Sequence, residues 1–280
     1  MTRWRQLIQS VWFERGIQRG KSIPRGDTFA PGGFRGPECP NNCPVRYRCA
    51  DVPSWEHVHV LSQVDYGEPR FVTPICTVQD VAELVGMPVD TVKAWAGQRR
   101  SRRQMITRIA QPHRGWPSVP LVGLAEATAL RSLKAVLPLP EVQAAAAWIR
   151  ERFDAPHALA NRRLMTDGAY AYVREGHSEL YRVRTKQLTF VEVIEDHLRP
   201  LVFEDDDYPV AFRVKIPGVT IDPRFNAGRM TFQRNRVPVF AVAGSLAGGD
   251  SVDEVMQQYG LTPQEVQAVA EHREWAAKAA

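Results

Sequence analysis

One helix-turn-helix pattern occurs twice in this 280-residue chain, and the repeat constrains the fold more than any other feature of the sequence. Residues 77–95 (TVQDVAELVGMPVDTVKAW) align without a gap with residues 251–269 (SVDEVMQQYGLTPQEVQAV). In each copy a hydroxyl residue is followed three positions later by an acid, the pattern of a capping box, and a glycine then favours the left-handed conformation that ends a helix. The paired positions are Thr77 and Ser251, Asp80 and Glu254, and Gly86 and Gly260. The repeat predicts two short helix pairs, with a plain αα corner as the alternative for either copy.

The two copies differ in charge. The formal net charge of the chain is +5, and seven of its cations and no acid lie between Thr91 and Trp116. A local excess of cations is an electrostatic footprint for a polyanion. The second copy carries acids but no Lys or Arg from Ser251 to His272, so it is poorly suited to phosphate contact. We therefore expect the first copy to bind DNA and the C-terminal helices to form a protein-packing surface for dimerisation.

The first copy supplies the candidate DNA-binding residues. Its second helix, starting near Pro88, has Val89, Val92 and Trp95 facing inward at spacings of three. We expect the outward positions to be Asp90, Thr91, Lys93 and Ala94. Because the outward N-terminal residues of a recognition helix face base edges, Thr91 and Lys93 are the base-contact candidates, with a solvated surface lysine as the alternative for Lys93.

The segment from Gln98 to Arg114 is expected to form a wing, either a basic hairpin or a loop. Arginine suits phosphate contact because its planar fork matches phosphate oxygens. The candidate contacts in this wing are Arg99, Arg100, Arg102, Arg103 and Arg108.

Residues 71–154 resemble the DNA-binding domain of MerR-type regulators. The shared order is a helix-turn-helix, a basic wing, an ALRSL-type helix, a turn from Pro138 to Pro140 and a further helix, preceded here by a short strand expected at 71–75. The apolar positions of the two later helices are Leu124, Ala127, Leu130, Leu133, Val142, Ala145, Ala146 and Ile149. The chain departs from those regulators after residue 154, where LMTDGAYAYVREGHSELYRVRTKQLTF alternates like strands or a hairpin and leads into a short helix, LTFVEVIEDHL.

The C-terminal residues 216–272 resemble the small C-terminal domain of VapB-like antitoxins of type II toxin-antitoxin modules, and residues 157–210 resemble the linking region of longer members. The motifs that carry the resemblance are Ile221-Asp222-Pro223, Gly228, Arg236-Val237-Pro238-Val239, Gly249-Asp250-Ser251 and Tyr259-Gly260-Leu261-Thr262. Arg229, Arg234 and Arg236 are expected on a hairpin there, as accessory DNA contacts or as surface cations.

Two further clusters have chemical alternatives. Cys39, Cys43 and Cys49 are spaced C-x3-C-x5-C, which matches no common paired zinc knuckle, so we expect reduced thiols in a tail, with a zinc site as the alternative. Cys76 is expected to be a small buried hydrophobe. The acidic run Glu204–Asp207 is expected in a solvated loop that complements a basic partner rather than in a metal site.

The sequence predicts a mainly α-helical protein in four parts. These are a flexible N-terminal tail (1–67), a MerR-like winged helix-turn-helix domain (68–160), a middle segment with a possible hairpin and a helix (161–212), and a small C-terminal winged-helix-like domain (213–276). No apolar stretch approaches the roughly 18 residues of a transmembrane helix and no secretory signal is evident, so a cytoplasmic location is expected.

The resemblance implies an antitoxin that neutralises a PIN-like ribonuclease toxin and represses its own operon as a homodimer. No catalytic constellation, cofactor or metal site is expected. The toxin is expected to contact the middle segment Arg182–Phe203, or else an N-terminal helix with Trp4, Arg5, Trp12 and Arg15. The alternatives are a stand-alone MerR-like transcriptional regulator without a toxin and, more distantly, a metal-dependent nuclease.

Overall fold

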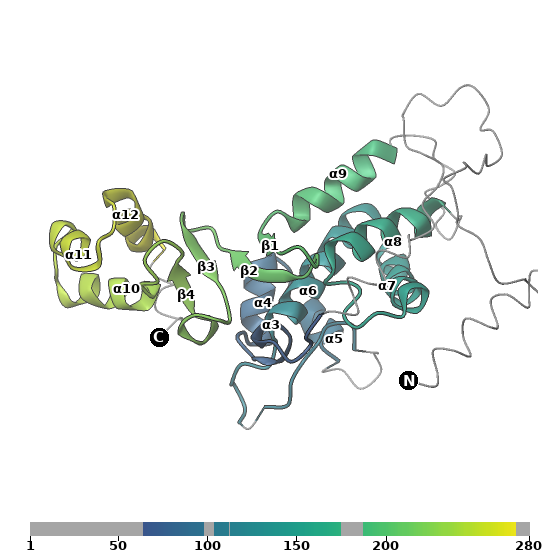
Figure 1. The fold of residues 1–280 in the computed structure, drawn as a ribbon, viewed down its shortest axis with the longest axis horizontal. Coiled ribbons are helices and arrows are strands. Elements are labelled where there is room, and N and C mark those ends of the chain that lie inside the picture. Colours follow the sequence, from purple (N-terminus) through teal and green to yellow (C-terminus); the bar gives the residue numbers. More distant parts are fainter. Residues whose placement is uncertain (1–63, 98–103, 112, 175–186, 273–280) are drawn as a thin grey trace, which may run out of the picture. The chain divides into compact units, whose positions relative to one another are not determined.

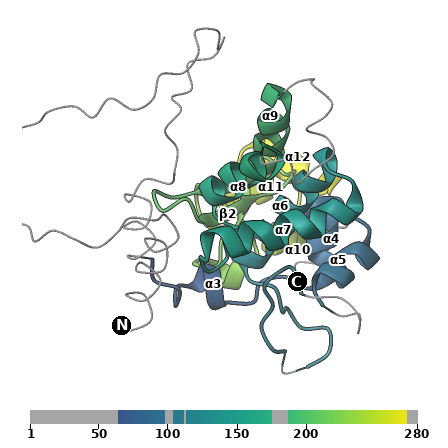
Figure 2. The same cartoon turned by 90° about the vertical axis from the view of Figure 1, so that its right-hand side faces the viewer.

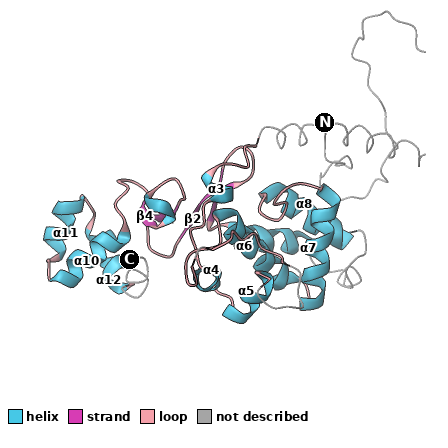
Figure 3. Cartoon of the chain, turned by 90° about the horizontal axis from the view of Figure 1, so that it is seen from below, coloured by secondary structure: helices cyan, strands magenta, loops and turns pink. Residues whose placement is uncertain are grey.

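The computed structural model describes residues 64–97, 104–111, 113–174 and 187–272, all of which lie in one unit that runs from Pro53 to Ala280 (Figure 1). Within these residues the protein is mainly helical, with a small antiparallel sheet of four short strands (Figure 3). The helices are α3 (Pro69–Val72), α4 (Val78–Val85), α5 (Val89–Trp95), α6 (Leu121–Val136), α7 (Leu139–Phe153), α8 (Arg162–Arg174), α9 (Gln187–Leu198), α10 (Val239–Gly248), α11 (Val252–Tyr259) and α12 (Pro263–Glu271).

Helices α4 and α5 form the first predicted helix-turn-helix. Thr77 caps α4 in a full capping box, because its hydroxyl accepts from the Asp80 amide while the Asp80 carboxylate accepts from the Thr77 amide. Gly86 ends the helix in the left-handed region with φ 63°. Pro88 is the residue before α5, so the predicted start of the second helix is confirmed.

Residues 71–75 do not form the expected strand. Pro69–Val72 is a single helical turn, and only Cys76 forms a β-bridge, with Val119. The proline at the first helical position and the buried Phe71 favour this turn, which directs the Phe71 ring into the core.

Helix α6 is the centre of the larger core. Its residues from Leu121 to Leu130 are all buried, Glu126 and Thr128 among them, so other parts of the protein cover this stretch on every side. It contacts α4, α7, α9 and strand β2 (Pro209–Arg213). Figure 2 shows α6 and α7 running beside one another within this group. The two helices predicted from the apolar positions that begin at Leu124 and at Val142 are therefore present as α6 and α7.

The segment predicted as strands or a hairpin begins as helix α8 instead. Leu164, Met165, Ala169 and Tyr172 are buried, which is the spacing of one helix face rather than of a strand. A Cβ at Gly168 would lie only 2.8 Å from the Phe153 ring, so this glycine permits close packing of α8 on α7 rather than a turn. The alternation of Ala and Tyr at 169–172 is too short to override that face. The predicted helix at 188–198 is confirmed as α9.

The sheet is a meander with the order β1-β2-β3-β4, formed by β1 (Leu201–Phe203), β2, β3 (Val219–Ile221) and β4 (Met230–Phe232). Phe212 pairs with Ile221 and Thr220 with Thr231. Leu201, Phe212 and Ile221 pack in the larger core, whereas Val219 and Phe232 pack in a second core with α10, α11 and α12. The expected domain boundary between residues 212 and 213 falls inside strand β2.

Helices α11 and α12 form the second predicted helix-turn-helix. Ser251 and Glu254 make a capping box, and Gly260 ends α11 with φ 62°, within 1° of Gly86. Val255, Leu261, Val266 and Val269 are buried, as predicted from the sequence repeat. No helix in the described part of the chain is long and apolar enough to cross a membrane.

Candidate nucleic-acid interface

Helix α5 presents a small polar face to solvent. Asp90 and Lys93 are exposed and Thr91 is half-buried. Ala94, expected on this outward face, is buried together with Val92 and Trp95. At the C-terminal end of α5, the amide of Met105 donates to the carbonyl of Trp95 at 2.7 Å. Lys93 is therefore the exposed cation that α5 offers to a groove.

Arg108 joins the two ends of the predicted wing. Its guanidinium donates to the carbonyl of Ala96 at 3.3 Å and to the Ser118 hydroxyl at 3.4 Å, and the residue is half-buried. It thus links the C-terminal end of α5 to the segment that leads into α6. Arg99, Arg100, Arg102 and Arg103 lie outside the described residues.

The loop that ends at Ser118 includes the C-terminal part of the predicted wing, which was expected to end at Arg114. Its ends are paired by the amide of Ile109, which donates to the carbonyl of Ser118 at 2.8 Å, and Ser118 in turn donates to Cys76 at 2.9 Å. Arg114 is exposed, and the indole of Trp116 is 55% exposed beside His113. An exposed tryptophan beside cations is a feature that the sequence reasoning missed, although PHRGWPS places it between turn-forming residues.

The start of the wing is fixed to α6 by a buried carboxylate. Glu126, only 2% exposed, accepts a hydrogen bond from the Thr107 amide and lies 3.5 Å from the Arg150 guanidinium and 3.8 Å from His157 Nδ1. The Thr107 hydroxyl lies 3.0 Å from the same His157 nitrogen. A buried charge needs such partners, and here they position the backbone on which the wing begins.

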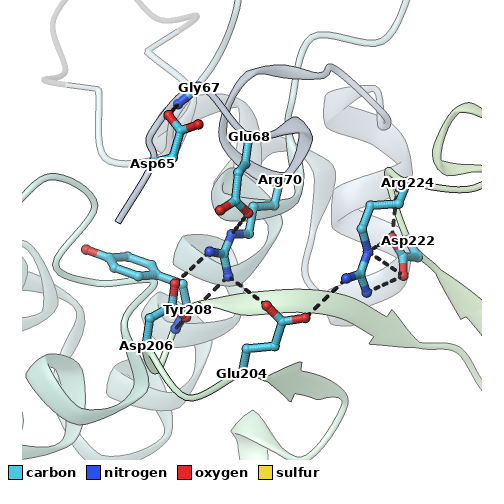
Figure 4. A network of polar contacts seen from close by, with 9 residues as sticks. All are labelled: Asp65, Gly67, Glu68, Arg70, Glu204, Asp206, Tyr208, Asp222 and Arg224. Atoms are coloured by element: carbon cyan, nitrogen blue, oxygen red, sulfur yellow. Dashed lines mark hydrogen bonds and ion pairs between the residues drawn. The ribbon is translucent and has the colours of Figure 1, made fainter. Parts of the chain in front are cut away.

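The acidic turn between β1 and β2 is solvated at Glu204 and Asp205, as expected, but three of its acids also pair with the protein's own arginines (Figure 4). Arg70, 5% exposed, donates to both oxygens of Asp206 at 3.2 and 2.6 Å. Its Nε lies 2.9 Å from the Glu68 carboxylate, an ion pair without hydrogen-bond geometry. Its Nη1 lies 3.8 Å from the Glu204 carboxylate. The basic partner expected for this turn is therefore, at least in part, intramolecular.

The same turn leads to a buried tyrosine. The Tyr208 hydroxyl donates to the carbonyl of Pro156 at 2.6 Å, and its ring meets those of Phe71 and Tyr66 edge-on. Burial, then the neighbouring Tyr66 and Asp206, raise the pKa of Tyr208 above its ordinary value. Tyr66 belongs to the segment predicted as a flexible tail, and the structure packs its ring against the core.

The C-terminal arginines are exposed but engaged. Arg224 pairs with Asp222 at 2.9 Å and with Glu204 at 3.1 Å, and the hydrogen bond that its guanidinium donates to Asp222 raises the pKa of Arg224. Arg234 donates to the carbonyl of Gly260 at 2.8 Å and to Glu265 at 3.1 Å. The guanidinium of Arg229 lies 5.1 Å from the Phe240 ring centroid, and that of Arg236 lies 3.6 Å from the Phe225 centroid.

Candidate metal ligands are few in this part of the chain. The described residues contain no group of three or more His, Cys, Asp or Glu side chains placed to hold a metal ion. Cys39, Cys43 and Cys49 lie outside the described residues. Cys76 is buried at 3% exposure, and burial raises its thiol pKa, so it is the small buried hydrophobe predicted from the sequence.

Two segments of the chain match known protein families. Residues 74–146 match a family described as "Putative DNA-binding HTH domain", and residues 219–272 match a family described as "Protein of unknown function (DUF433)". Over 226 residues the chain is 29% identical to "Putative antitoxin VapB45" of Mycobacterium tuberculosis, covering 71% of this chain and 93% of that protein.

The chain is a distant homologue of this mycobacterial protein. A solved crystal structure of Rv2018 from Mycobacterium tuberculosis has 27% sequence identity and superposes with a TM-score of 0.57, covering 72% of this chain and 99% of that one. The resemblance to VapB-like antitoxins inferred from the C-terminal motifs is thereby confirmed.

Proposed function

We propose that the protein is the antitoxin of a type II toxin-antitoxin module. The observation that carries the proposal is the homology to a protein named as an antitoxin, because the match covers 93% of that protein. The separate match of residues 74–146 to a family described as a DNA-binding domain supports it. The protein binds operator DNA, represses its own operon and neutralises a cognate toxin. It acts without enzymatic activity, as a homodimer in the cytoplasm.

Operator binding uses α5 and the wing. Lys93 and Thr91 approach base edges, and Arg99, Arg100, Arg102 and Arg103 contact phosphates. Arg108 acts mainly by holding the wing to the end of α5, as its two hydrogen bonds support. Arg229, Arg234 and Arg236 remain candidates for accessory contacts.

The toxin in this proposal is a PIN-like ribonuclease whose metal-centred acidic site is occluded by the antitoxin. Part of the favoured toxin-binding segment, 182–203, is already used internally, since Ile194 and Leu198 of α9 are buried in the larger core. Its exposed residues there include Glu195 and Asp196, which do not complement an acidic site. The N-terminal segment with Trp4, Arg5, Trp12 and Arg15 is the alternative contact.

Co-expression with the product of the neighbouring open reading frame tests this function. We expect rescue of growth and copurification of the two proteins. A chain that begins at Val60 keeps the Tyr66 ring against Phe71 and tests the tail separately. If the tail carries the toxin contact, this chain binds operator DNA normally but loses rescue. If the full chain binds DNA yet neither rescues growth nor copurifies with the neighbouring protein, the antitoxin assignment is wrong and a stand-alone regulator is favoured.

A further inference from the structure

Helix α10 is a surface helix without a charged residue. Its sequence, VFAVAGSLAG, has one polar side chain, Ser245, whose hydroxyl lies 3.2 Å from that of Tyr259. Val239 and Val242 are buried in the smaller core, with Leu246 packed against it. A helix that is apolar all round is normally covered on every side.

The opposite face of α10 is open. Phe240, Gly244, Ala247 and Gly248 follow the helical spacing of four, three and one, so they share one stripe. Gly244, Ala247 and Gly248 are exposed, Phe240 is half-buried, and a Cβ at Gly244 or Gly248 would meet nothing within 4 Å. Val252, just beyond the helix, is one of three exposed large hydrophobic residues among those described. We call this exposed, uncharged stripe the α10 face, and such a face is a candidate contact surface.

Charges of opposite sign lie at the two ends of the α10 face. At the N-terminal end, the Arg229 guanidinium lies over the Phe240 ring. Arg236 lies two residues before Pro238, the N-cap of the helix. At the C-terminal end, Asp250 directly follows Gly249, and Asp253 is in the first turn of α11. All four charged residues are exposed.

This arrangement is self-complementary under a two-fold axis. If two copies of α10 pack antiparallel, the cationic end of each helix lies against the acidic end of the other. The antiparallel helix dipoles are favourable in the same orientation. The helix is about 15 Å long at 1.5 Å per residue, so both end contacts form together when the helices are centred near Gly244.

We propose that the α10 face is the homodimer contact, with a second copy of this chain packed antiparallel on it. The proposal deepens the proposed function, which includes a homodimer, by locating its surface on α10 rather than on the α11 and α12 helices predicted from the sequence. One ten-residue helix with its flanking charges gives a small interface, so the dimer is weak and salt-sensitive in the absence of DNA.

Sedimentation velocity on the full chain, without DNA or toxin, tests this contact. Over about 1 to 100 µM we expect a reversible monomer–dimer equilibrium. Gly244→Glu places like charges near the axis and should raise the dissociation constant at least about tenfold. Gln264→Glu, which adds the same charge at an exposed position on α12, should leave it nearly unchanged. Circular dichroism melts check that both variants fold.

A charge exchange makes the test independent of Gly244. Arg229→Asp and Asp250→Arg should each weaken the dimer, and the double variant should recover most of the affinity, since the two positions meet only across the axis. A monomer at all concentrations, or a dimer indifferent to Gly244→Glu, would overturn the proposal. Because toxin and operator are absent, these outcomes leave the antitoxin assignment untouched.

Discussion

At the scale of single residues, Arg70 shows why a charge run in a loop cannot be interpreted from sequence alone. Its guanidinium is buried and meets Asp206, with Glu68 and Glu204 close by. The separation of 136 positions between Arg70 and Asp206 leaves no local signal of their pairing. The sequence therefore indicated the acidic turn, but it did not indicate which cations pair with its acids.

Replacing Asp206 should lower the free energy of unfolding more than replacing Arg70. Asp206→Ala leaves the buried Arg70 guanidinium short of its bidentate partner, and we expect a loss of about 2 kcal/mol, reduced because Glu68 and Glu204 remain near. Arg70→Met keeps the volume of the stem without a charge and should be milder. Chemical denaturation of both variants measures the difference, and a larger loss for Arg70→Met would contradict this account of the network.

At the scale of elements, the sequence predicted best where one local rule determines the structure. The capping boxes at Thr77 and Ser251 and the left-handed glycines needed no tertiary information. Prediction was wrong where packing decides between local options, as at 162–174, where one face of helix α8 is buried and Gly168 permits its close approach to α7. The sequence did not predict the contacts by which Glu126 holds the start of the wing, because Thr107 and His157 come from distant segments.

The turn between α11 and α12 provides a direct test at this scale. Gly260 has φ 62° with open space around it, so backbone strain alone acts on a substitution. Gly260→Ala should destabilise the fold by about 1 kcal/mol, and Gly260→Val by more, because a β-branched residue tolerates this region worse. Gly260→Asn is the control, since asparagine enters the left-handed region more readily. Equal melting temperatures for the parent, Ala and Val proteins would contradict the turn assignment.

At the scale of the whole molecule, the two helix-turn-helix units share one backbone pattern but differ in charge. The first helix-turn-helix has exposed Lys93 and leads into a cation-rich wing, whereas the second has acids and pairs Glu265 with Arg234. The backbone amide of the N-cap residue Ser251 donates to the Glu254 carboxylate, and this hydrogen bond is the main cause that lowers the pKa of Glu254. The repeat therefore predicts the backbone geometry of both units, whereas the charges predict nucleic-acid binding for the first unit alone.

A salt titration of operator binding tests that central claim most directly. The measurement compares the parent protein with a variant in which Arg99, Arg100, Arg102 and Arg103 are all alanine, using the native upstream DNA. We expect binding to weaken by at least about 1 kcal/mol at low salt, and the salt slope to become shallower by about 0.9 for each phosphate that the variant no longer neutralises. A matched variant lacking the exposed Arg163 and Arg199 should bind like the parent. Unchanged affinity and slope in the wing variant would contradict the assignment of this region as the DNA interface.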